Sequence, residues 1–197
     1  MVEQHFNKLN KFYSTNVKHY HTIYHVENLL NLWNQYREEF LNEFPGLNEG
    51  ALITAIRWHD SFYQPGNQLN EELSIQRYMN TYGEQYDPFV CAIILSTKIG
   101  YEDLNSTPEF KVMHDLDWSG FNNFDEFKEN CNKICTEAVE LRHFDINVVK
   151  QNQINFYRRF AEKPLYLTKT FEKFNSSAKT NMLNLANELE QKLLEGY

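Results

Sequence analysis

The side chains of this chain best placed to do chemistry are histidines and aspartates on the apolar faces of predicted helices. His25 continues an apolar stripe four residues before Leu29, and His59 and Asp60 each follow an apolar residue by one turn in the next predicted helix. Residues three or four apart share a helix face, so these three side chains should point inward. A buried polar group without a partner costs about 1–3 kcal/mol, and a bare charge costs more. A divalent cation removes that cost, so the pattern indicates a metal site rather than hydrogen-bonded core histidines.

Two aspartates near the end of a later predicted helix, Asp115 and Asp117, are both candidates for a fourth ligand. Asp117 follows Met113 and His114 by four and three residues, whereas Asp115 points toward nearly the opposite face. A set of histidines and aspartates suits one divalent transition metal ion, Mn, Fe, Ni, Co or Zn, with Mg as an alternative. It does not meet the preference of calcium for oxygen ligands alone.

Helices are the only elements that the sequence predicts, so the expected fold class is all-α. Apolar residues recur at steps of three and four between residues 22 and 44, and Pro45-Gly46 ends the run. Thr107-Pro108 starts another helix with a hydroxyl cap and a proline at the first position. Asn70 is predicted to cap a helix that carries Glu71 in its first turn. The predicted helices cover residues 22–44, 48–60, from 70 onward, 88–97, 108–117, 124–141, 147–162 and 170–194.

Composition narrows the classes of protein and partner. The 197 residues suit a single domain over residues 1–197, with C-terminal helices within 124–195, and 42% hydrophobic residues argue against disorder. The net charge of −8 should repel duplex nucleic acid and anionic membranes, while one metal ion and a few local bases could still hold a small phosphorylated molecule. The chain shows neither a signal-type leader nor an apolar run long enough to span a bilayer, so we expect a cytoplasmic protein with three free cysteines.

Five motifs in order along the chain resemble the HD superfamily, which is named for its His-Asp doublet, and in particular its bacterial group of predicted metal-dependent HD phosphohydrolases. The resemblance spans roughly residues 20–118 and continues weakly to Asn181. It implies a helical bundle and a metal held by His25, His59, Asp60 and Asp117, with Asp115 in support. The motifs are Tyr20 to His25, Ala55 to Asp60, Asn70-Glu71 with Ser74, Ser96-Thr97-Lys98, and Asp115-Leu116-Asp117.

The same resemblance implies roles for residues around the metal. The stretch from Tyr20 to His25 is also similar to cyclic-nucleotide phosphodiesterases, in which the first histidine protonates the leaving oxygen, so His21 is the predicted general acid. Glu71 is predicted to orient water or a ligand histidine, and Lys98, with Arg57 as a weaker candidate, to neutralise a phosphate oxygen. The plain alternatives are a helix cap or a hydrogen bond to a supporting carboxylate for His21, an exposed first-turn acid for Glu71, and solvated surface positions for the two bases.

The chain also departs from the family pattern. Ile99-Gly100-Tyr101 stands where a further histidine is frequent, and Cys135 stands where an arginine is typical. The expected function is therefore hydrolysis of a small phosphoester, such as a nucleotide, at a single metal. The alternative is a metal-binding module that acts as a ligand sensor or interaction domain. An HD-type oxygenase would need two irons and more histidines than the chain places. The apolar face of the last helix could form a homodimer or simply complete the core.

Overall fold

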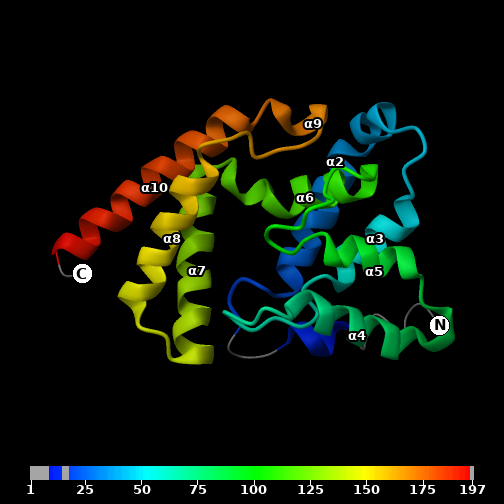
Figure 1. Cartoon of the computed structure of the whole chain (residues 1–197), viewed down its shortest axis with the longest axis horizontal. Coiled ribbons are helices and arrows are strands. Elements are labelled where there is room, and N and C mark those ends of the chain that lie inside the picture. The colour runs from blue at the N-terminus through cyan, green and yellow to red at the C-terminus, as the bar shows by residue number, and fades with distance from the viewer. Residues whose placement is uncertain (1–8, 15–17, 196–197) are drawn as a thin grey trace.

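The computed structural model describes residues 9–14 and 18–195, and these residues fold into helices and loops without a strand (Figure 1), which confirms the all-α class. Residues 9–13 are helical. The α-helices that follow are α2 (Ile23–Glu43), α3 (Glu49–Trp58), α4 (Asn70–Tyr82), α5 (Pro88–Leu95), α6 (Pro108–Asp117), α7 (Phe124–Arg142), α8 (Ile146–Phe160), α9 (Lys169–Glu172) and α10 (Asn175–Glu195). Two 3₁₀ turns, η1 (Gly83–Gln85) and η2 (Trp118–Phe121), follow α4 and α6.

Helices α2, α3, α5 and α6 pack together and form the part of the core that carries His25, His59 and Asp117. The buried face of α2 comprises His25, Val26, Leu29, Trp33 and Phe40, and it packs against α3, α6 and α9. The side chain of Asn48 caps α3 by accepting a hydrogen bond from the backbone N–H of Ala51, and α3 then packs on α5. The polar residues of the α2 face therefore meet the ends of α3 and α6.

Helices α7, α8 and α10 form a second group on the other side of the molecule (Figure 1). Asn123 caps α7, and His143 ends it in the left-handed conformation with φ 54°. Asp145 then accepts from the first N–H groups of α8. The 3₁₀ turn η2, which follows Asp117 in the chain, contacts α6, α7 and α10 and therefore joins the two groups of helices.

The predicted helices agree with the observed bounds except in two places. Residues 170–194 were expected as one helix, but α9 ends at Glu172 and α10 starts at Asn175. Asn70 was expected to cap α4, but Leu69 holds the cap position, and the Asn70 side chain pairs instead with the backbone N–H and C=O of Gln64. Asn70 thus fixes the loop that follows the His-Asp doublet.

The C-terminal helix contributes to the core. Leu185, Ala186 and Leu189 of α10 are buried, and the helix packs along α8, while Leu183 and Leu194 remain exposed. Within the described residues, no helix combines the length and apolar character needed to cross a bilayer.

Candidate metal centre

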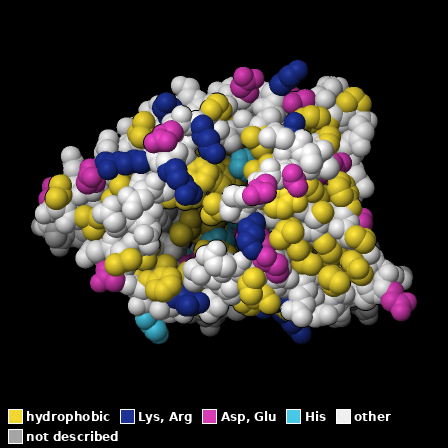
Figure 2. All heavy atoms as spheres, viewed as in Figure 1, with side chains coloured by type: hydrophobic (Ala, Val, Ile, Leu, Met, Phe, Trp, Pro, Cys, Tyr) yellow, Lys and Arg dark blue, Asp and Glu magenta, His cyan; other side chains and the backbone are white. Residues whose placement is uncertain are grey.

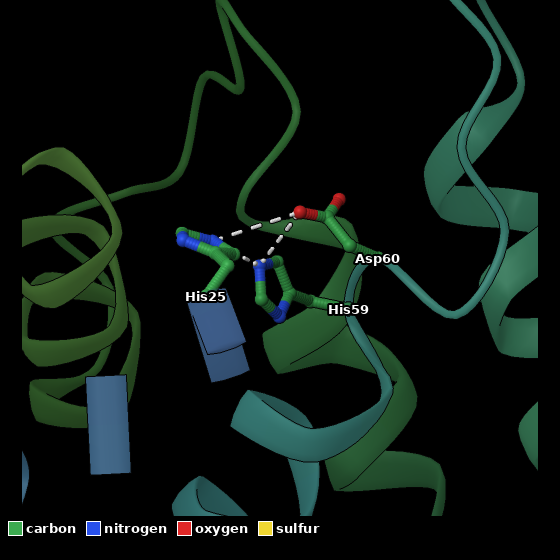
Figure 3. A group of neighbouring side chains, drawn as sticks. All are labelled: His25, His59 and Asp60. Atoms are coloured by element: carbon green, nitrogen blue, oxygen red, sulfur yellow. Dashed lines mark hydrogen bonds and ion pairs between the residues drawn. The ribbon is translucent and has the colours of Figure 1, made fainter. Parts of the chain in front are cut away.

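Four side chains from three helices converge on one point. His25 lies in the first turn of α2, His59 is the C-cap residue of α3, Asp60 follows it, and Asp117 is the last residue of α6. Figure 3 shows His25, His59 and Asp60 directed toward one another, with the two rings facing the Asp60 carboxylate. The ends of α3 and α6 thus deliver polar groups onto the buried face of α2.

The distances between donor atoms are short. Nε2 of His25 lies 3.3 Å from Nε2 of His59 and 3.2 Å from Oδ1 of Asp117. Oδ2 of Asp60 lies 3.1 Å from Nε2 of His59 and 3.7 Å from Nε2 of His25. Oδ1 of Asp117 lies 3.4 Å from Nε2 of His59. The donor atoms of His25, His59 and Asp60 all lie within 4.8 Å of one another, so this group could hold a metal ion.

The spacing can be compared with that around a small transition metal ion. With ligands at about 2.1 Å, neighbouring donor atoms around one ion lie about 3.0–3.4 Å apart. The separations between the two imidazole nitrogens and the nearer carboxylate oxygens are of this size. Two imidazole nitrogens that face each other without a cation have only one proton at most to share, whereas both can bind the same ion.

Neighbouring groups determine which atoms of His59, Asp60 and Asp117 carry protons. Nδ1 of His59 donates to the backbone carbonyl of Ile56 at 2.9 Å, which leaves Nε2 as the atom that faces the site. Burial would lower the pKa of His59, but Asp60 and Asp117 raise it well above its usual value. Burial would likewise raise the pKa of both aspartates, and the neighbouring histidines hold it below the usual range. The carboxylates are thus ionised and ready to bind a cation.

His21 lies beside this group and is paired with a buried carboxylate. Nδ1 of His21 is 2.6 Å from Oε2 of Glu137, a residue of α7 that is 0% exposed. The second oxygen of Glu137 accepts from the backbone N–H groups of His19, Tyr20 and His21 at 2.7, 2.7 and 2.9 Å. The His21 ring also stacks on Tyr63, with 3.3 Å between ring centroids. Its orientation is therefore fixed from two sides.

A cavity of ≈ 490 Å³ opens from the metal-binding group and continues between α7 and α8. His21, His25, Asp60 and Asp117 line its inner end, together with Glu71. Figure 2 shows the molecule hollowed beside α7, with hydrophobic and histidine side chains in its depth. A ligand in this cavity would have access to the candidate metal centre and to His21.

Some predicted site residues lie together and others do not. The half-buried Glu71 reaches the cavity, and burial raises its pKa. Lys98 is not among the residues that line the cavity, because its Nζ binds Glu72 at 2.5 Å and the carbonyl of Gln68 at 2.8 Å. Arg57 also lies outside the lining, with its Nε buried and without a hydrogen-bond partner.

Asp115, expected in support of the metal, points elsewhere. Its carboxylate is fully buried and accepts three hydrogen bonds of 2.7–2.8 Å, from the backbone N–H groups of Leu167 and Thr168 and from the Thr168 hydroxyl. It therefore holds the segment before α9 against α6.

Sequence reasoning missed Glu137, Tyr63 and Lys18. Glu137 follows Ile134 by three residues on the inward face of α7, and an acid within an apolar stripe was the available signal. Lys18 lies near the doublet, with Nζ 3.5 Å from the backbone oxygen of Asp60, and burial lowers its pKa. Its position before the first motif gave no comparable signal.

Comparison of the chain with protein-family models, with curated proteins and with solved structures finds no match in any of the three. The resemblance to the HD superfamily therefore stays a prediction that the motifs alone support.

Proposed function

We propose that the chain is a metal-dependent phosphohydrolase of the HD type, with one divalent transition metal ion held by His25, His59, Asp60 and Asp117. The observation that carries the proposal is the convergence of these four side chains at the inner end of a cavity that His21 also lines. Such an ion lowers the pKa of coordinated water and polarises a phosphoryl oxygen, which together suit hydrolysis of a small phosphoester.

In this proposal His21 acts as the general acid. Glu137 accepts a hydrogen bond from Nδ1–H and stabilises the positive imidazolium, which leaves Nε2–H to protonate the oxygen of the leaving group. The stack on Tyr63 keeps the ring plane fixed while the proton moves. The pair with Glu137 also fits the plain alternative of a histidine bonded to a supporting carboxylate. The acid role is supported by the access of His21 to the cavity beside the candidate ligands.

Glu71 is the proposed acceptor of the proton that the attacking water releases. Burial raises the pKa of Glu71 from its ordinary value, which makes its carboxylate a stronger base. Lys98 carries no role in the proposal, because its ammonium group is bound to Glu72 and Gln68. The positive charge that meets the phosphate would come from the metal and from the protonated His21.

The test is a measurement of bound metal together with hydrolysis of a panel of phosphoesters, including nucleotides and an aryl phosphate, with Mn, Fe, Ni, Co, Zn or Mg added. We expect about one metal ion per chain and turnover, both lost in His59→Ala and Asp60→Ala. His143→Asn, which changes an exposed histidine at the end of α7, is the matched control. His21→Ala should keep the metal and lose at least about 100-fold in rate.

Two outcomes would count against the proposal. Stoichiometric metal without hydrolysis of any phosphoester would favour a metal-binding module that senses a ligand. A protein that binds none of these ions and loses no stability on chelation would exclude the metal centre itself.

A further inference from the structure

The cavity extends well beyond the space that a phosphate would need at the candidate metal centre. Its outer part lies between α7 and α8, and most of its wall there is apolar. Phe121 and Phe127 pack on Tyr157 of α8, with 6.2 and 5.0 Å between ring centroids, and these three rings line the cavity together with Phe156 and Ile134. Cavities of about 300–1,000 Å³ with such walls hold organic groups of moderate size.

The charges along the wall restrict what the ligand can carry. Among the described residues that line the cavity, the charged ones are Asp60, Glu71 and Asp117, and neither a lysine nor an arginine is present. Proteins that bind several phosphate groups supply arginines or lysines for them. A second phosphate in this cavity would instead meet Glu71 near the metal, or neutral amides and apolar side chains farther out, without a base to neutralise it. The centre thus suits a ligand with a single phosphate group, held at the metal.

The polar groups of the outer part are neutral amides. Asn130, Asn152 and Gln153 line the cavity. The thiols of Cys131 and Cys135 lie 3.2 and 3.1 Å from Oε1 of Gln153, and a thiol donates to a carbonyl oxygen. This arrangement leaves the NH₂ group of Gln153 as the part of the amide that is free to donate to a ligand. Three amides are too few to replace the hydration of a bare sugar with many hydroxyls.

We infer that the space between α7 and α8 binds the organic group of the substrate, and that the substrate is a phosphomonoester of an uncharged, bulky and largely aromatic alcohol. This inference rests on the proposed function and narrows its substrate class. It excludes nucleoside di- and triphosphates and small sugar phosphates as good substrates.

The first experiment compares kcat/KM for 1-naphthylmethyl phosphate, methyl phosphate and a nucleoside triphosphate with the metal-loaded protein, because the two monoesters have alkyl leaving groups of similar reactivity. We expect 1-naphthylmethyl phosphate to exceed methyl phosphate by about 10- to 100-fold, because burial of even one methylene group separates substrates by about 10-fold or more. Equal or higher kcat/KM for methyl phosphate or the triphosphate would overturn the inference and leave the proposed function intact.

The second experiment fills the cavity. Asn152→Trp at its mouth and Ile134→Trp in its wall should raise KM for 1-naphthylmethyl phosphate by about tenfold relative to KM for methyl phosphate. Asn155→Trp is the matched control, because Asn155 is an exposed asparagine of the same helix that does not line the cavity. Measurements of helix content and of bound metal identify a variant that fails to fold. Because Asn152 is exposed, its position should accept a larger side chain. An unchanged KM in a folded Asn152→Trp would contradict the inference.

A binding measurement separates this inference from the proposed function. The non-hydrolysable 1-naphthylphosphonate should bind the metal-loaded protein at least about tenfold more tightly than methylphosphonate, and Asn152→Trp should remove the difference. If that result holds while no phosphoester is hydrolysed, the proposed function fails and the ligand class stands. If the two phosphonates bind equally, the ligand class fails whatever the hydrolysis results are.

Discussion

Glu137 connects the two halves of the chain through a single side chain. One carboxylate oxygen accepts three consecutive backbone N–H groups, from His19 to His21, and the other pairs with the His21 ring. His21, the side chain that Glu137 pairs with, and the adjacent backbone groups hold the pKa of this buried carboxyl below its usual range, against the effect of burial. Glu137 is therefore a charged positioning residue for His21 as well as a cap for its segment.

Replacing this carboxylate should separate the two roles. Glu137→Gln keeps an oxygen for the backbone N–H groups and removes the charge beside His21, so we expect the metal to remain bound while kcat/KM falls about 100-fold. The loss should fall on kcat, with KM within about twofold, because the group acts on proton transfer and not on binding. Glu140→Gln, which affects the exposed pair with His19, is the control. An unchanged kcat in a folded Glu137→Gln that binds metal would assign Glu137 a purely structural role.

His59 should exchange a proton for the metal. Asp60 and Asp117 outweigh burial and raise the pKa of His59 in the metal-free protein, so its Nε2 carries a proton at neutral pH. A metal ligand must be deprotonated, and we expect binding at pH 7 to release about one proton per ion. Calorimetry in buffers of different ionisation enthalpy measures this number. Metal affinity should fall as the pH drops, and release of no proton would show that His59 is neutral before binding.

The residues in and around the candidate metal centre differ in how far the sequence could identify them. His25, His59, Asp60 and Asp117 stand on predicted inward faces, so periodicity and motif order were enough to group them. Glu137 lies 116 residues from His21, and a pairing of that kind depends on how α7 packs, which local periodicity does not report. The expected phosphate role of Lys98 depended on the side chain being free, and its ion pair with Glu72 follows from the position of α4.

At the scale of elements, α6 is the helix whose two ends do most to place the site. Thr107 and Pro108 start it as the sequence predicts, with the Thr107 hydroxyl accepting from the N–H of Phe110. Near its other end, Asp115 binds the segment before α9 while Asp117 turns to the histidines. Asp115 and Asp117, two residues apart at one helix end, thus contact different parts of the structure. Because both lie near the end of the same predicted helix, both were candidates for the fourth ligand.

Removal of the Asp115 carboxylate should loosen this junction. Asp115→Ala leaves two buried N–H groups and the Thr168 hydroxyl without their acceptor, and each unsatisfied group costs about 1–3 kcal/mol. We expect the free energy of unfolding in urea to fall by at least about 2 kcal/mol. Asp103→Ala, at an exposed position, should change it by less than about 0.5 kcal/mol. Equal effects of the two substitutions would show that the junction does not depend on Asp115.

Apolar periodicity alone did not predict the break between α9 and α10. The apolar spacing from residue 170 onward continues through the break, so it predicts one helix. The side chain of Asn175 accepts from the backbone N–H groups of Leu165 and Tyr166, and the Thr168 hydroxyl caps α9 by accepting from Phe171. These contacts set the start of each helix, and they involve residues that periodicity does not weigh.

At the scale of the whole molecule, the cavity exists because the two groups of helices meet along η2 and along a second contact. Gly66, in the loop after the His-Asp doublet, has φ +73° and lies against the ring of Phe144 at the corner between α7 and α8. An added Cβ at Gly66 would lie 3.3 Å from that ring. The loop that follows the His-Asp doublet and the corner of the second group therefore form adjoining walls of one cavity.

A metal ion at the candidate centre would tie α2, α3 and α6 together, because its ligands lie up to 92 residues apart in the chain. An ion at a concentration of 100 times its Kd for the folded chain, and without affinity for the unfolded chain, stabilises the fold by about 2.7 kcal/mol. For a chain of this size we expect chelation to lower the Tm by roughly 5–10 °C. His59→Ala should have a Tm that the chelator leaves unchanged, since its set of ligands is incomplete. If neither chelation nor added metal changes the Tm of the parent protein, the four side chains are held in place by their own hydrogen bonds. That result would exclude the proposed metal centre.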